Sequence, residues 1–249
     1  MGEEWSVRSG REALEIYSAG TGPRVLFVHG WEGAAQDFAV MAAAFRRAGY
    51  STVAFDHPAH GRSTGRRTTL PALSRAVLDV ARATGPFAAV VGHSLGGSAT
   101  LLALRDGLPT RCAVLIAPPY DARPFVHQLG KGMGASEARI AGAITRIERE
   151  VVAVRGRAMD RTAAHLRLPG LVLHDRSDRA VPFTHGVAVA AAWPRSRFVA
   201  LDGLGHRRVL DAPEVHQEIL TFVRRSIAEP SAGAREWAPP MAAATEIAP

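Results

Sequence analysis

One serine of this chain stands in a setting that can turn a hydroxyl into a nucleophile. Ser94 is the centre of Gly92-His93-Ser94-Leu95-Gly96, directly after the apolar run 88–91 and before a stretch rich in small residues. A tight turn from a strand into a helix holds such a serine in strained backbone angles, and the flanking glycines leave it room. The turn projects the hydroxyl from the carboxyl edge of a sheet, where open α/β sheets bind ligands. The pattern therefore predicts a nucleophilic serine at position 94.

A serine hydroxyl needs a general base, and the base needs a carboxylate that orients it. The expected strand 198–201 leads through Asp202-Gly203-Leu204-Gly205 to His206, and the expected strand 171–174 leads to Asp175 and Asp178. Acid and histidine would therefore reach the same sheet edge as Ser94. We expect His206 to be the base, and this pattern alone leaves Asp175 and Asp178 as alternatives for the acid.

Attack on a carbonyl also needs two backbone N–H groups that bind the developing oxyanion. Leu95, directly after the serine, would supply one of them. The other would come from the loop after the early strand 25–28, which reads His29-Gly30-Trp31-Glu32-Gly33. Its glycines allow the backbone to turn towards Ser94. The N–H groups of Leu95 and Trp31 are therefore the expected oxyanion hole.

The elements that must position these residues alternate between strands and helices. Each expected strand is a short, mostly apolar run, as in parallel sheets covered on both faces. The expected strands are 25–28, 52–55, 88–91, 113–116, 171–174 and 198–201, and the expected helices are 37–48, 73–84, 95–105, 186–193 and 213–227. An antiparallel hairpin is expected over 5–17. This alternation predicts an α/β fold with a mostly parallel central sheet flanked by helices.

Two segments depart from this alternation. About fifty residues, roughly 121–167, contain no strand signal but carry Ile140, Ile144, Ile147 and Val151 on one face of an expected helix. An insertion of this size is commonly a lid or binding element, so we expect a small helical lid. The segment 229–249 is rich in proline and alanine and reads as a tail. The chain is thus expected to be one domain, 1–228, followed by this tail.

Composition excludes several classes of protein. Hydrophobic residues make up 47% and charged residues 21%, which is typical of a globular chain, and the single cysteine, Cys112, rules out an intrachain disulfide. The net charge of +7 comes from scattered basic residues that are not interleaved with aromatics, so we expect no nucleic-acid partner. The N-terminus has no apolar segment typical of a secretory signal, and no run approaches the roughly 18 apolar residues of a membrane span. We therefore expect a soluble, cytoplasmic protein.

Together these motifs resemble the α/β-hydrolase superfamily over about residues 5–228, in particular its bacterial lysophospholipase-like and esterase-like members. The run from Phe55 to Ser63 is similar to the family's Asp-x-x-Gly-His-Gly-x-Ser turn, with Ala59 where glycine is usual. Asp175 stands where a glycine often precedes the catalytic acid by three residues. The resemblance implies that Asp178, three residues before Val181-Pro182, is the acid.

The resemblance implies a serine hydrolase that cleaves a small-molecule carboxylic ester with Ser94, His206 and Asp178 as its triad. It implies no metal and no organic cofactor. The same triad could serve a thioesterase, a peptidase, a C–C hydrolase or an acyltransferase, and a hydrolase-like receptor without catalysis is the alternative from another class. The sequence does not determine the natural substrate, its acyl length or the oligomeric state.

Overall fold

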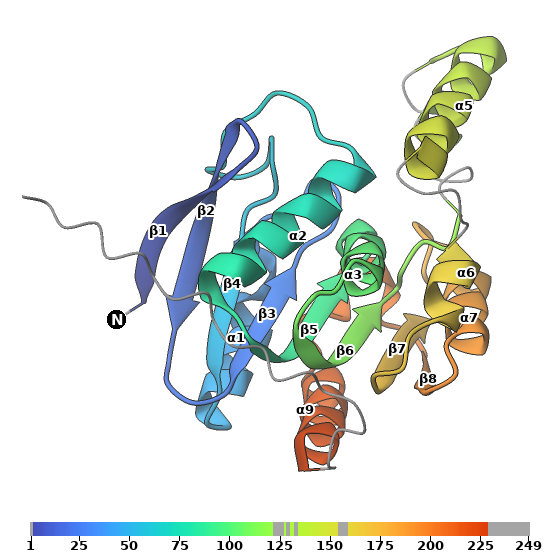
Figure 1. Cartoon of the computed structure of the whole chain (residues 1–249). Helices are drawn as coiled ribbons and strands as arrows, with labels where there is room; N and C mark the ends of the chain where they lie inside the picture. Colours follow the sequence, from blue (N-terminus) through green and yellow to red (C-terminus); the bar gives the residue numbers. More distant parts are fainter. Residues whose placement is uncertain (1, 122–126, 128–129, 132–133, 154–158, 229–249) are drawn as a thin grey trace, which may run out of the picture.

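The computed structural model describes residues 2–121, 127, 130–131, 134–153 and 159–228 (Figure 1). Within them a single eight-stranded sheet has the order β1-β2-β4-β3-β5-β6-β7-β8. Its strands are β1 (Glu3–Ser9), β2 (Glu12–Ala19), β3 (Arg24–Val28), β4 (Ser51–Phe55), β5 (Phe87–His93), β6 (Thr110–Ile116), β7 (Gly170–Asp175) and β8 (Ser196–Leu201). The β1–β2 and β2–β4 pairs are antiparallel, and all other neighbours are parallel. The expected hairpin and mostly parallel sheet are therefore present.

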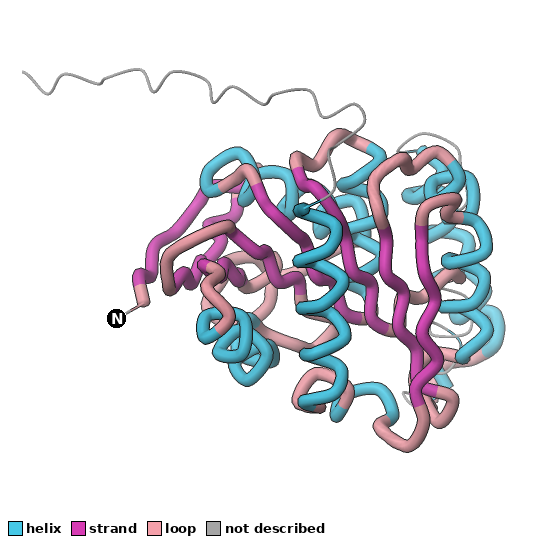
Figure 2. Tube along the Cα trace, turned by 90° about the horizontal axis from the view of Figure 1, so that it is seen from below, coloured by secondary structure: helices cyan, strands magenta, loops and turns pink. Residues whose placement is uncertain are grey.

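Helices cover both faces of this sheet (Figure 2). The helices of the described residues are η1 (Ala35–Phe38), α1 (Ala39–Arg47), α2 (Leu70–Thr84), α3 (Leu95–Arg105), α5 (Glu137–Ala153), α6 (Met159–Ala164), α7 (Phe183–Ala192), α8 (Gly205–Arg208) and α9 (Pro213–Ala228). One buried apolar cluster joins the sheet to α2, α3, α6 and α7, and a second joins the opposite face to α1 and α9. The core thus consists of two apolar layers with the sheet between them.

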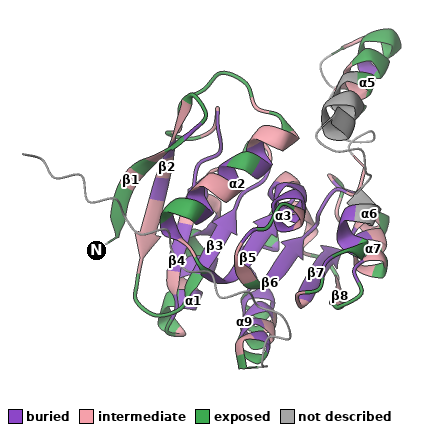
Figure 3. Cartoon of the chain, viewed as in Figure 1, coloured by how far each residue is buried: buried purple, intermediate pink, exposed green. Residues whose placement is uncertain are grey.

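The strand β3 shows why a nearly continuous apolar run becomes a central strand. Successive side chains of a strand point to opposite faces. Leu26 and Val28 accordingly pack in the α2–α3 layer, whereas Val25 and Phe27 pack in the α1–α9 layer. All four are buried, and Figure 3 shows the central strands as a continuous buried band. A strand with two apolar faces can only lie between two helical layers, which places β3 and its neighbour β5 at the centre.

The predicted fold class is confirmed, with local differences at several helices. The expected helix 37–48 begins as the short 3-10 helix η1 and continues as α1. Helix α2 begins before the expected residue 73, because the side chain of Thr69 accepts a hydrogen bond from the N–H of Ala72 and caps the first turn. The residues around His206 form the short helix α8, which the sequence patterns had not indicated.

The expected lid and tail are only partly described. Of the segment 121–167, the structure describes mainly α5 and α6, and Figure 1 shows α5 standing beyond the sheet and its covering helices. Ile140, from the predicted apolar stripe, is buried there. The segment 229–249 lies outside the described residues, so the predicted tail and domain boundary remain predictions.

Candidate active site

Ser94 occupies the turn that joins the central strand β5 to helix α3. Its backbone angles are φ 52° and ψ −129°, which L-residues other than glycine rarely adopt. The turn is held in place because the Ser94 N–H donates to the carbonyl of Ile116 at 2.8 Å and its carbonyl accepts from the N–H of Gly97 at 2.8 Å. The residue is only 8% exposed. The expected strand–turn–helix setting of Ser94 is therefore present in the structure.

The glycines around Ser94 are required by close packing of backbones. A Cβ at Gly96 would lie 2.2 Å from the carbonyl oxygen of His29 and 2.3 Å from that of Val28. A Cβ at Gly92 would lie 2.8 Å from Cα of Gly97. The missing side chains allow the start of α3 to approach the end of β3. This close approach brings the loop after β3 to the serine.

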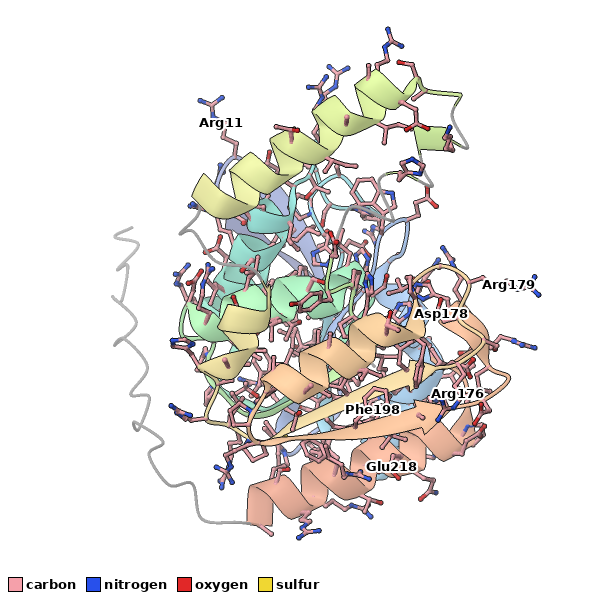
Figure 4. All side chains as sticks on the ribbon, turned by 90° about the vertical axis from the view of Figure 1, so that its right-hand side faces the viewer. Arg11, Arg176, Asp178, Arg179, Phe198 and Glu218 are labelled. Carbon is pink, nitrogen blue, oxygen red and sulfur yellow. The ribbon has the colours of Figure 1, made fainter. Side chains whose placement is uncertain are left out.

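The structure places the predicted base and acid in line with Ser94. Nε2 of His206 lies 3.1 Å from Oγ of Ser94, and Nδ1 of His206 lies 2.7 Å from Oδ2 of Asp178. Because a carboxylate only accepts hydrogen bonds, Nδ1 carries the proton and Nε2 presents a lone pair to the serine hydroxyl. His206 is positioned by α8 and Asp178 by the loop after β7. Figure 4 shows Asp178 on this loop, where the neighbouring Arg179 points away from the body of the protein.

The side chain of Asp178 is fully buried and is held as a carboxylate by its hydrogen bonds. Burial acts to raise its pKa, but the nearby imidazoles of His174 and His206 and the N–H of Val181 outweigh it, so the pKa lies below the ordinary value. Oδ1 accepts from the N–H groups of Ala180 and Val181 at 2.8 and 2.9 Å, which leaves Oδ2 for His206. The loop backbone thus fixes the orientation of the carboxylate.

A buried histidine next to the serine holds the backbone of the predicted base. Nε2 of His93 lies 2.8 Å from the carbonyl oxygen of His206, and the two rings are 4.7 Å apart. Burial and the neighbouring His206 lower the pKa of His93 to about 3, so its ring is neutral near pH 7. Because a carbonyl only accepts, Nε2 of His93 is the donor. This contact ties α8 directly to the turn that carries Ser94.

The other acid candidate, Asp175, does not contact His206. It is 2% exposed, and its Oδ2 accepts the N–H of Leu204 at 2.8 Å. Its Oδ1 accepts both the N–H and the hydroxyl of Ser177, at 2.8 and 2.5 Å. The geometry therefore separates two acids that the motif pattern alone left open.

Two buried histidines, His29 and His57, hold the loop that carries Trp31 through hydrogen bonds to its backbone. Nδ1 of His29 donates to the carbonyl of Gly30 at 2.8 Å, and Nε2 accepts from the N–H of His57 at 3.0 Å. Nε2 of His57 in turn donates to the carbonyl of His29 at 3.0 Å. Burial lowers the pKa of His29 to about 4 and that of His57 well below its ordinary value. Two neutral rings therefore fix the backbone just before Trp31.

The two expected oxyanion donors are Leu95, directly after the serine, and Trp31, on the loop after β3. Leu95 is the first residue of α3, so its N–H has no acceptor within the helix. Trp31 shares with Ser94 a cavity of about 290 Å³. This cavity is lined by Gly30, Trp31, Gln36, Asp37, His93, Ser94, His206, Arg207, Leu210 and Asp211. The site thus combines the serine, the imidazole and one expected donor in one mostly polar pocket.

The turn after β4 supports this loop from the side. Asp56 is buried, and its carboxylate accepts from the N–H groups of Ala35 and Arg62, both at 2.8 Å. Gly61 has φ +50°, and a Cβ there would lie 2.1 Å from Oδ2 of Asp56. Ala59 adopts φ +64°, the left-handed conformation that favours glycine. The Asp56 turn is therefore a structural brace with one strained position.

The sequence patterns did not predict that His93, His174 and Asp175 hold the backbone of the loops around the site. Nε2 of His174 donates to the carbonyl of Val181 at 3.0 Å and lies 3.5 Å from Asp178. The polar residues His174 and Asp175 at the end of an otherwise apolar strand could have indicated such a role.

Within the described ranges, no group of three or more His, Cys, Asp or Glu residues could hold a metal ion. The same residues include no helix that is long and apolar enough to cross a membrane.

The sheet order and the tight turn at Ser94, which joins β5 to α3, are those of an α/β-hydrolase fold. The sequence profile of the alpha/beta hydrolase family matches residues 25–217, and the chain belongs to this family. A monoacylglycerol lipase from Mycolicibacterium smegmatis is 28% identical to this chain in an alignment 215 positions long. The match covers 69% of this chain and 76% of that protein.

Solved structures share the fold at low sequence identity. An esterase from Thermogutta terrifontis is 18% identical with a TM-score of 0.70, and the match covers 90% of this chain and 99% of that one. A bromoperoxidase from Bacillus anthracis is 19% identical with a TM-score of 0.68, over 89% and 100% of the two chains. The proteins of this fold carry the names of different reactions, so the reaction of this chain must be argued from its own site.

Proposed function

We propose that this protein is a serine hydrolase that cleaves a small-molecule carboxylic ester. The observation that carries the proposal is the line of contacts from Ser94 through His206 to Asp178, at 3.1 and 2.7 Å. A hydroxyl, an imidazole and a carboxylate in this order form the arrangement that activates serine nucleophiles. The lipase and esterase names among similar proteins support ester hydrolysis as the reaction.

In the proposed reaction, Ser94 Oγ attacks the ester carbonyl while Nε2 of His206 takes the hydroxyl proton. Asp178 stabilises the imidazolium that forms and keeps its Nδ1 proton in place. The N–H groups of Leu95 and Trp31 bind the oxyanion of the tetrahedral intermediate. His206 then protonates the departing alcohol, and water activated by His206 releases the acid from the acyl-enzyme.

We also propose that the segment 121–167 acts as a lid that sets acyl-chain preference. Its described part contains α5, which stands beyond the covering helices (Figure 1) and in which Ile140 is buried. The cavity beside Ser94 is small and mostly polar, so a long acyl chain must extend out of it. Phe125 and Met133 are the lid residues that we expect to line the mouth of the pocket, and both lie outside the described residues.

A fluorophosphonate probe tests the proposed nucleophile directly, because it reacts only with an activated serine. We expect stoichiometric labelling, located on Ser94 by peptide mass spectrometry, and no labelling of Ser94→Ala. A panel of p-nitrophenyl esters from acetate to palmitate then gives the acyl preference. An unlabelled, folded wild-type protein would instead favour a receptor that uses the pocket without catalysis.

A further inference from the structure

Asp175 contacts both of the loops that carry the other two proposed triad residues. Its Oδ1 accepts from Ser177, which precedes Asp178 on the loop after β7, and its Oδ2 accepts from Leu204, which precedes His206 on the loop after β8. We infer that Asp175 is a positioning residue that sets the separation of the acid from the base. This inference rests on the proposed function.

In the loop before His206, Leu204 packs against the apolar cluster on the α1–α9 face, but the two glycines beside it contribute no side chain that would hold the backbone. Gly203 and Gly205 have φ +81° and +68°, and a Cβ at either position would meet no atom within 4 Å. The backbone of this loop is restrained by hydrogen bonds as well. Arg208 donates to the carbonyls of Leu204 and Gly203 at 3.0 and 2.7 Å, and Asp175 accepts the Leu204 N–H from the sheet side. The loop position therefore depends on polar contacts to its backbone.

A carboxylate suits this role better than any other side chain of the same size. Three donors converge on Asp175: the N–H and hydroxyl of Ser177 and the N–H of Leu204. Burial acts to raise the pKa of Asp175, but these hydrogen bonds outweigh it, so its pKa lies below the ordinary value. An asparagine has one acceptor oxygen, so its NH₂ group would face a donor on one of the two loops.

The sheet makes this contact possible only at the end of β7. Asp175 pairs with Leu201 of β8, and the N–H of Arg176 donates to the carbonyl of Leu201 at 2.8 Å, so the two strands separate just beyond this point. The side chain of Asp175 therefore lies in the fork between the two loops. A glycine at this position would leave no side chain between the two loops, and the three donors would lose this acceptor.

The test compares Asp175→Asn and Asp175→Gly with a matched control, Asp202→Asn. Asp202 is a carboxylate on the same loop as Leu204, but it is exposed and faces the exposed Arg176 at 3.6 Å. The measurements are kcat and KM on p-nitrophenyl acetate, the rate constant of fluorophosphonate labelling, and the thermal midpoint. Glycine is the second variant because it has no amide that would clash with the donors.

We expect both Asp175 variants to lose about 10- to 100-fold in kcat and in labelling rate, the scale of a displaced catalytic group. KM for the short ester should stay near the wild-type value, and Asp202→Asn should match wild type. Equal kcat and labelling rates in a folded Asp175→Gly and in Asp202→Asn would overturn the inference, as would a loss seen only in KM. Ser94→Ala is measured in parallel: if it retains turnover, the proposed function fails, whatever Asp175 does.

Discussion

His206 Nε2 and Ser94 Oγ lie 3.1 Å apart although 112 residues separate them in the chain. The two are brought together because β5 and β8 end at the same edge of one sheet. The backbone of His206 is in addition bound to His93, the neighbour of Ser94, at 2.8 Å. The proposed base is therefore held to the serine turn by a contact that involves neither Nε2 of His206 nor Oγ of Ser94.

Ser94→Ala should lower ester turnover on the order of 10⁴-fold or more, as in other enzymes whose triad serine is removed. The substitution removes one oxygen from a turn whose backbone hydrogen bonds remain, so the thermal midpoint should change little. Steady-state kinetics of the purified variant give the result. Turnover close to wild type would exclude the proposed mechanism.

Asp178→Asn should reduce kcat by about 10⁴-fold, the effect of the same change in a well-studied serine protease. An amide can present its NH₂ group to His206 and so favour the tautomer whose Nε2 carries the proton. Asp175→Asn should lose far less, because Asp175 contacts the loops and not the imidazole. Measuring kcat for both variants ranks the two acids, and the reverse ranking would move the acid to Asp175.

Gly96→Ala should abolish activity and destabilise the fold by about 1–3 kcal/mol or more, the range for overpacked sites. The new methyl group would meet the carbonyls of Val28 and His29, which belong to the backbone and cannot turn away. Chemical denaturation and ester turnover measure both effects. Gly142→Ala is the matched control, since a Cβ there meets nothing within 4 Å on helix α5. Equal behaviour of the two variants would contradict the close approach of α3 to β3.

Ala59→Gly should raise the free energy of unfolding by about 0.5–1 kcal/mol. Relief of the left-handed strain is worth about 1–2 kcal/mol, and the greater freedom of glycine in the unfolded chain costs about 0.4–1 kcal/mol. Denaturant titration measures the difference. The control is Ala72→Gly in the first turn of α2, which lacks such strain and should destabilise the protein. A loss of stability in Ala59→Gly would show that the turn tolerates alanine without strain.

Stability should fall as pH is lowered from about 6.5 towards 4, because His29 and His93 are buried as neutral rings. Burial lowers the pKa of His29 to about 4 and that of His93 to about 3, from 6.5. Below pH 6.5 the unfolded chain therefore binds protons that the folded protein does not. Each such group contributes a slope of up to about 1.4 kcal/mol per pH unit.

Denaturant titrations at several pH values measure this slope. His29→Gln should make the slope shallower, since one buried ring fewer takes up a proton on unfolding. The exposed Gln217 gives the control variant Gln217→Ala, which removes no titratable group, so its slope should equal that of the wild type. An unchanged slope in His29→Gln would show that His29 does not carry this pH dependence.

The sequence by itself determined the fold class and the candidate nucleophile. The apolar runs and the small residues around Ser94 act locally: their period and their lack of side chains dictate a buried strand, a tight turn and a helix. Each predicted strand is present for this reason. His206 could likewise be predicted, since a histidine after a strand and a Gly-x-Gly turn must lie near a sheet edge.

The family resemblance implied Asp178 as the acid, but only the tertiary structure shows which carboxylate contacts His206 and what the other one does. Asp175 and Asp178 are three residues apart on one loop, and no local property of the sequence fixes how far that loop reaches. The direction of the two carboxylates depends on donors from elsewhere in the chain, namely Leu204 for Asp175 and His206 for Asp178. Likewise, His93 and His29 became buried and neutral only through packing of distant segments, because desolvation is a property of the assembled fold.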